Sequence, residues 1–306
     1  MFASIADSLR ESAKKVVWSQ WQAVGAMVAS PRKARAIVDP EALVLLSLAL
    51  RDYERRLWDI LAWWGAEASF VLSVQRVRNL ARKYPEPVQQ RLSEFARLAF
   101  ETGGDFRWKS LAGPSQGPEA RVKNKRKTGP EVMEPSALIL RLRLGLGVGI
   151  KADILSYLLG IGGAWASVKD ISAAICYSNR AIRRAAEEMA AARLINSKAE
   201  TPAEYHVFPK TWAQILETRE AFPRWRFWHP AFAFVARCLQ WIEEDILKEA
   251  SYVTSSRARD LLELHRSAFT WNQIAVPDPG EHRGIDYLDA FNTAVMRLVG
   301  WFEESI

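Results

Sequence analysis

Three arginines and an asparagine fall close together near the middle of the chain, where they could bind nucleic acid. They are Asn179, Arg180, Arg183 and Arg184. In a helix, positions three and four apart are neighbours, so this spacing gathers the side chains on its first turns. The planar guanidinium group pairs with guanine edges or phosphate oxygens through two parallel hydrogen bonds. The pattern therefore favours contact with a duplex.

The surrounding sequence predicts two short helices separated by a turn. Ser167 and Asp170 fit a capping box, which predicts a first helix over 168–176. Ser178 can cap a second helix over 179–193, whose outward face carries the arginines and whose inward face is apolar. In such a pair, the amino end of the second helix is the part that enters the major groove.

The hydrophobic pattern changes from a helical period to alternation after this second helix, which predicts a β-hairpin. The other elements predicted around the helix pair are helices over 150–159 and 208–216 and strands over 164–166, 195–197 and 205–207. The order helix, helix, helix, hairpin predicts a winged helix-turn-helix over 136–217, in a mainly α protein with helical regions on both sides.

The stretch SVKDISAAICYSNRAIRRAAEEMAAARLINSKAETPAEYHVF resembles the winged helix-turn-helix of MarR-like transcriptional regulators. The resemblance extends beyond this stretch to about 70–80 residues, about a quarter of the chain, and implies a capped recognition helix, a small-residue–Leu–Ile motif and a wing. It implies DNA contacts from Ser178, Asn179, Arg180, Arg183, Arg184 and, in the wing, Lys198. We add Lys169 and Tyr177, which stand beside the two helix starts, to this predicted DNA-binding set.

The charge balance supports a polyanion partner for the whole chain but not for its central segment. The net charge is +7 and the pI is about 9.5, which favours polyanions through counterion release. Residues 150–217 carry eight Lys and Arg against seven Asp and Glu, so that segment is nearly neutral. Double-stranded DNA is the expected partner, and an adaptor whose winged domain docks a partner protein is the alternative.

Residues 1–104 are predicted to form an N-terminal helical region. Asp39 can cap a helix that begins at Pro40, and Glu41 favours the positive end of its dipole. The predicted helices are 8–28, 42–64, 73–83 and 87–100. Residues 105–135, rich in Pro and Gly, are predicted to be a linker. Its cations, either solvated or touching the DNA backbone, are Arg121, Lys123, Lys125, Arg126 and Lys127.

Residues 218–306 are predicted to form a C-terminal helical region that could join two copies of the chain. The predicted helices are 227–250, 255–269 and 285–305. The last helix presents a continuous apolar stripe of Leu288, Phe291, Val295, Leu298 and Phe302. Since twofold pairing lets a regulator bind palindromic sites, we expect a homodimer, with this stripe as the candidate interface and packing within the chain as the alternative.

Chemistry of other kinds is not expected. Cys176 and Cys238 lack CxxC spacing, and the histidines are scattered, so we expect no metal site and no cofactor. The glycines at 145–149 lack the Lys-Ser/Thr of a phosphate-binding loop. An enzyme in the N-terminal helical region is the weaker alternative. The sequence contains no 18-residue uncharged apolar run and no signal-peptide pattern at its start, which predicts a cytoplasmic protein with no membrane partner.

Overall fold

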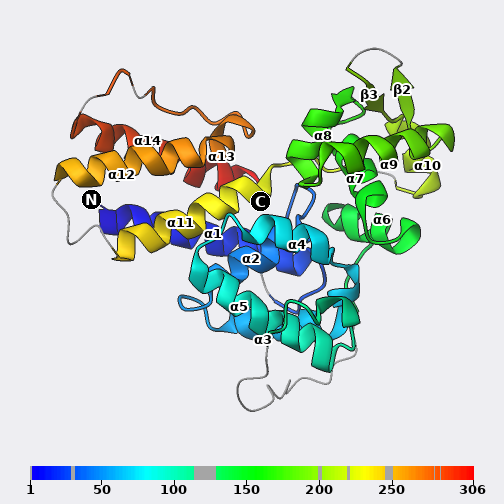
Figure 1. Ribbon diagram of the computed structural model, residues 1–306, viewed down its shortest axis with the longest axis horizontal. Helices are drawn as coiled ribbons and strands as arrows, with labels where there is room; N and C mark the ends of the chain where they lie inside the picture. The colour runs from blue at the N-terminus through cyan, green and yellow to red at the C-terminus, as the bar shows by residue number, and fades with distance from the viewer. Residues whose placement is uncertain are drawn as a thin grey trace.

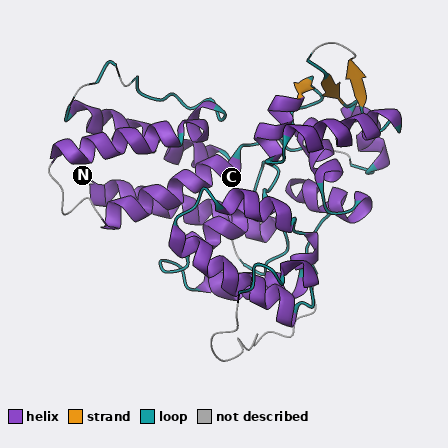
Figure 2. Cartoon of the chain, viewed as in Figure 1, coloured by secondary structure: helices purple, strands orange, loops and turns teal. Residues whose placement is uncertain are grey.

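The structure is a computed structural model that describes residues 2–28, 32–113, 129–198, 202–218, 221–244, 251–278, 280–282 and 284–306. It is mainly helical, with one small antiparallel sheet of three strands, as the sequence predicted (Figure 2). The sheet lies at one end of the molecule beside α6–α10, and α12 and α14 lie at the opposite end (Figure 1). The five cations of the predicted basic linker lie outside the described residues.

The N-terminal region consists of helices that pack on the central α2. They are α1 (Phe2–Ala23), α2 (Pro40–Leu50), α3 (Arg56–Glu67), α4 (Val74–Ala81) and α5 (Glu86–Arg97). Short 3-10 turns occur at Ser69–Val71, Phe106–Trp108 and Pro135–Ala137, and a π-helical turn at Leu98–Thr102. Helix α1 ends earlier than predicted because Gly25 adopts a φ of 100°, which stops a right-handed helix.

The single long helix predicted over 42–64 is wrong, because a tight turn divides it into α2 and α3. The backbone amides of Tyr53 and Glu54 both donate to the carbonyl of Leu50, at 3.0 Å each. This turn lets α3 fold back against α2, where Leu57 and Leu61 are buried. The apolar spacing is continuous across the break because both helices bury one face in the same core.

The first part of the predicted linker belongs to the N-terminal core. Trp108 is buried, and its ring meets that of Phe95 edge-on with centroids 5.2 Å apart. Ala112 is buried as well. Beyond the undescribed stretch, the amide of Glu131 donates to the carbonyl of Val24 at 3.0 Å. Both ends of the predicted linker are therefore held against the N-terminal helices.

The described residues of the central region form five helices and the sheet. Its elements are α6 (Leu138–Leu146), α7 (Ile150–Gly160), β1 (Ala166–Ser167), α8 (Val168–Ile175), α9 (Asn179–Ala191), β2 (Asn196–Lys198), β3 (Glu204–His206) and α10 (Pro209–Ile215). The strand order is β1-β3-β2, and Tyr205 of β3 pairs with Ala166 on one side and Ser197 on the other. The sequence did not predict α6, whose glycine-rich end leads directly into α7.

Local hydrogen bonds set the boundaries of α8 and α9 as predicted. The Ser167 hydroxyl accepts from the amide of Asp170 at 3.2 Å, and the Asp170 carboxylate accepts from the amide of Ser167 at 3.0 Å.

Gly163, just before β1, has a φ of 78° and lies so near the chain after β3 that a Cβ would come within 2.7 Å of the Val207 carbonyl. Only glycine therefore fits in the turn between α7 and β1, where the backbone comes this close to the residues after β3.

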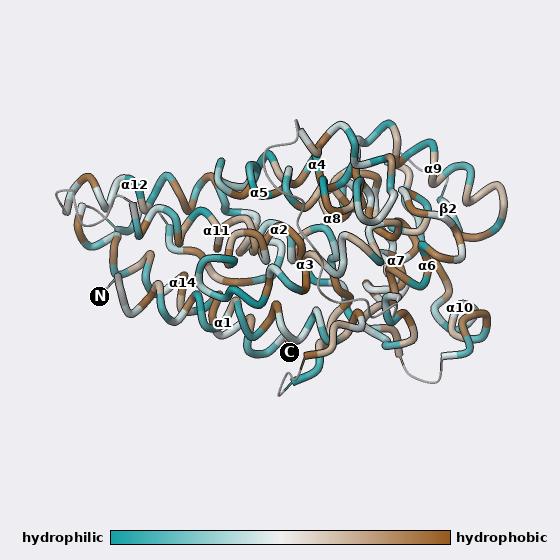
Figure 3. Tube along the Cα trace, turned by 90° about the horizontal axis from the view of Figure 1, so that it is seen from below, coloured by the Kyte–Doolittle hydropathy of each residue, from teal (hydrophilic) through white to brown (hydrophobic). Residues whose placement is uncertain are grey.

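The C-terminal region packs on α1 and α2: α11 contacts both helices, and α14 contacts α1. It consists of α11 (Trp228–Glu244), α12 (Ser251–Leu264), α13 (Arg266–Thr270) and α14 (Asp286–Glu304). Along α1, α12 and α14 the tube alternates between hydrophilic and hydrophobic colours, as expected for helices with one buried face (Figure 3). Within the described residues, no helix is long and apolar enough to cross a membrane.

The apolar stripe of α14 is not a free dimerisation surface, so that prediction is wrong. Phe291, Val295 and Leu298 are completely buried, and the helix packs against α1 and α12 of its own chain. Large apolar side chains that remain exposed on this helix or just before it are Ile285 and Met296. The stripe therefore stabilises the C-terminal region itself.

Candidate nucleic-acid interface

Helix α9 has the two-sided character that the sequence predicted. Its buried side consists of Ile182, Ala185, Ala186 and Met189, which pack toward α7 and α8. The side chains of its exposed first turns are Asn179, Arg180, Arg183 and Arg184. The apolar side of α9 is buried, whereas its amino half is left uncovered on the other side. These four side chains therefore share one accessible surface.

Two further predicted residues stand at helix starts. The hydroxyl of Ser178 accepts from the amide of Ala181 at 3.3 Å, so it caps α9 while remaining exposed. This cap fixes where the first turn of α9 begins and hence where Asn179 and Arg180 point. Lys169 is exposed on the first turn of α8.

Lys198 lies on the sheet, but its charge is already engaged. Its Nζ is 4.3 Å from the centre of the Trp165 ring and 3.6 Å from a carboxylate oxygen of Glu204. Lys198 and Glu204 are opposite each other in the β2–β3 ladder. On the sheet, Lys198 therefore offers a partly neutralised cation.

Tyr177 is not a surface contact, and its inclusion in the DNA-binding set is wrong. Its side chain is buried, with 8% of the residue exposed. The phenol donates to Asp153 at 3.3 Å, and its oxygen is 2.7 Å from the hydroxyl of Ser73. Burial is the main cause that raises the pKa of this phenol above its ordinary value. Tyr177 therefore ties the turn before α9 to the N-terminal region.

Tyr177 borders a buried ion network that the sequence did not reveal. Arg143 of α6 donates to both oxygens of Asp153, at 2.8 and 2.9 Å, and to Glu41 at 2.6 Å. Arg76 of α4 donates to Glu41 at 2.6 Å and to Asp39 at 2.7 Å. All five side chains are buried. Glu41, shared by both arginines, joins the N-terminal region to the central one.

Burial and pairing act in opposite directions on the pKa of Glu41. Burial alone would raise this pKa, but the positive charges of Arg143 and Arg76 outweigh burial and hold it below the ordinary value. For Arg143, burial would lower the pKa, and the carboxylates of Asp153 and Glu41 raise it instead. Each charge in the network therefore depends on its partners, since an unpaired buried ion is strongly unfavourable.

The same helix α4 also holds the turn between α8 and α9. The Nε of Arg76 donates to the carbonyl of Ile175 at 3.0 Å, and the side-chain Nδ2 of Asn79 donates to the carbonyl of Cys176 at 2.8 Å. These carbonyls end α8 and have no further helical partner. The N-terminal region thereby fixes the direction in which α9 leaves the turn.

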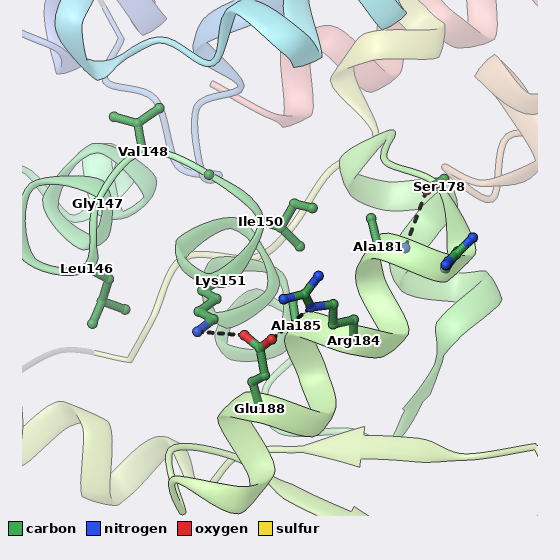
Figure 4. A pocket seen from close by; sticks show the side chains of 12 residues that line it. Leu146, Gly147, Val148, Ile150, Lys151, Ser178, Ala181, Arg184, Ala185 and Glu188 are labelled. Atoms are coloured by element: carbon green, nitrogen blue, oxygen red, sulfur yellow. Dashed lines mark hydrogen bonds and ion pairs between the residues drawn. The ribbon is translucent and has the colours of Figure 1, made fainter.

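A groove of about 720 Å³ opens beside the arginines of α9. Its lining comes from the α6–α7 loop, the start of α7 and α9. Figure 4 shows Lys151 and Arg184 on either side of Glu188, whose carboxylate they bind at 2.9 and 3.0 Å. Arg180 lines the same groove. The groove therefore has a cationic rim that continues the exposed surface of α9.

The fold also brings together Cys176 and His229, which are far apart in the sequence. The thiol sulfur is 3.3 Å from Nε2 of the imidazole, which lies 3.0 Å from the carbonyl of Ala173. Burial raises the pKa of the thiol and lowers the pKa of the imidazole well below its ordinary value. Burial therefore disfavours both the thiolate and the imidazolium, whereas nucleophilic catalysis needs a thiolate.

Among the residues that the structure describes, no group of three or more His, Cys, Asp or Glu side chains could hold a metal ion.

Comparisons of this chain with protein-family models, with curated proteins and with solved structures found no match.

Proposed function

We propose that this protein is a sequence-specific, double-stranded DNA-binding transcriptional regulator that uses a winged helix-turn-helix. In this proposal α7, α8 and α9 are the three helices, α9 is the recognition helix, and the three-stranded sheet is the base of the wing. The observation that carries the proposal is the exposed amino half of α9, where Arg180, Arg183 and Arg184 stand free of the core. Such a helix end is what enters the major groove in proteins of this type.

Three further features support DNA binding. Ser178 and the α4 contacts fix the start of α9, and base readout requires a recognition helix held in one orientation. The chain carries a net charge of +7, which favours a polyanion. The stretch from Ser167 to Phe208 resembles MarR-like regulators. Because twofold pairing lets a regulator bind palindromic sites, we also propose a homodimer. Since the stripe of α14 is buried, such a dimer would use another surface.

A salt titration of duplex affinity tests this proposal. Contact with three or four phosphates should make the logarithm of the association constant fall linearly with the logarithm of salt concentration, with a slope of about −2.7 to −3.6. The measurement is fluorescence anisotropy of a labelled duplex between low and physiological salt. A chain that binds no duplex at low salt, or binds equally at all salt concentrations, would contradict the proposal.

A protein-docking adaptor is the second candidate, and an exposed aromatic cluster favours it. The rings of Trp165 and His206 have centroids 4.6 Å apart, and those of His206 and Phe208 are 4.5 Å apart. Phe208 is 58% exposed, and aromatic side chains are enriched in protein interfaces. The same titration separates the two functions, because an adaptor would show no salt-dependent affinity for a duplex.

A further inference from the structure

We propose that Lys151 and Arg184 form a binding site for one phosphate of the DNA backbone, and that the carboxylate of Glu188 occupies this site in the free protein. The inference rests on the proposed DNA-binding function and adds a regulatory contact to it. Glu188 then competes with DNA for two cations of the interface.

The geometry of the three side chains carries this inference. Lys151 projects from the start of α7 and Arg184 from α9, and each binds a different oxygen of the Glu188 carboxylate, at 2.9 and 3.0 Å. A phosphodiester likewise presents two charged oxygens on one atom. An ammonium and a guanidinium that hold a carboxylate in this way are arranged to hold a phosphate.

The position of the site on the surface allows this exchange. The side chain of Arg184 is 84% exposed, that of Lys151 50% and that of Glu188 43%. The hydrogen bond from the Lys151 ammonium makes the largest contribution to lowering the pKa of Glu188, which therefore remains anionic at neutral pH. Ion pairs between exposed side chains contribute little to stability, so a phosphate can replace the carboxylate at little cost to folding.

The groove beside the three side chains suits a sugar–phosphate strand. Its apolar lining is Leu146, Val148, Ile150, Ala181 and Ala185. Arg180 and Arg184 lie along the same groove. A strand lying there would place its sugars on the apolar lining and its phosphates against the cations. Of the described residues that line this groove, Glu188 is the one with an acidic side chain.

The test compares Glu188→Gln with Glu187→Gln, which removes the same charge from an exposed neighbour on α9. Glu188→Gln should tighten binding to any duplex by about twofold to fivefold at low salt, since it frees two cations from an exposed ion pair. It should also steepen the salt slope by up to about 0.9, the increment for one phosphate contact, because Glu188 no longer competes for this site. Glu187→Gln should leave the slope unchanged.

Two further results decide the outcome. Adding Lys151→Gln to Glu188→Gln should return affinity and slope toward the original values, because the site then lacks its ammonium. If the unaltered chain binds a duplex and Glu188→Gln changes affinity and slope no more than Glu187→Gln does, the phosphate site is overturned and the proposed function stands. If the unaltered chain binds no duplex at low salt, both are overturned.

Discussion

Replacing Arg180, Arg183 and Arg184 together with alanine should abolish duplex binding and leave the folded protein intact. Each arginine that contacts a base edge or phosphate is worth about 1–3 kcal/mol, so the triple variant should lose at least about a hundredfold in affinity. All three side chains are exposed, and exposed substitutions change stability by about 0.5 kcal/mol or less each. Anisotropy with a labelled duplex measures the loss, and thermal unfolding checks the fold.

A charge-matched variant separates local contact from net charge. Arg35, Arg82 and Lys109 are exposed cations of the N-terminal region. Replacing these three with alanine removes the same total charge and should weaken duplex binding only slightly. Equal losses in the two triple variants would mean that general charge, and not α9, provides the affinity. Full affinity in the α9 variant would exclude α9 as the recognition helix.

Arg143→Ala should strongly destabilise the protein because it leaves the buried Asp153 without its arginine and the buried Glu41 with Arg76 alone. Arg143 binds Asp153 and Glu41 through four hydrogen bonds and also donates to the carbonyl of Val71 at 2.9 Å. Removing one partner from a buried ion pair costs about 3–5 kcal/mol. Urea unfolding should therefore show a free energy of unfolding lower by about that amount.

The destabilisation should also depend on pH in a defined direction. The pKa of Glu41 is lowered in the folded protein, so its contribution to stability is complete above its ordinary pKa of 4.5 and is lost as pH falls through the folded value. The difference in free energy of unfolding between Arg143→Ala and the original chain should thus shrink in acid.

Arg183→Ala, an exposed control, should change stability by about 0.5 kcal/mol or less. A similarly small effect of Arg143→Ala would show that the network does not hold the two regions together.

The features that the sequence predicted correctly are set by neighbours in the chain. The capping box of Ser167 and Asp170, and the caps at Ser178 and Asp39, each involve a hydroxyl or carboxylate and an amide three residues away. Such contacts depend on local spacing alone, so residue type predicts them. The division of α9 into buried and exposed sides follows from helical periodicity in the same way.

The features that the sequence missed depend on contacts across the fold. Tyr177 resembled a surface residue beside a cap, but its hydroxyl meets that of Ser73, 104 positions earlier. The ion network joins Glu41 to Arg143, 102 positions apart. A weak signal was present, since Glu41, Arg143 and Asp153 each interrupt an apolar run. Charges placed among buried positions require partners, but periodicity does not say which ones.

The most direct test of the account is selection of bound duplexes from random DNA by the full-length protein, followed by sequencing. An exposed recognition helix held in one orientation should enrich a short consensus, and a homodimer should repeat it with inverted symmetry. The same selection with Arg183→Ala should lose preference at one or two adjacent positions of that consensus. Bound pools without any enriched sequence, or a consensus that Arg183→Ala leaves unchanged, would contradict readout of DNA by α9.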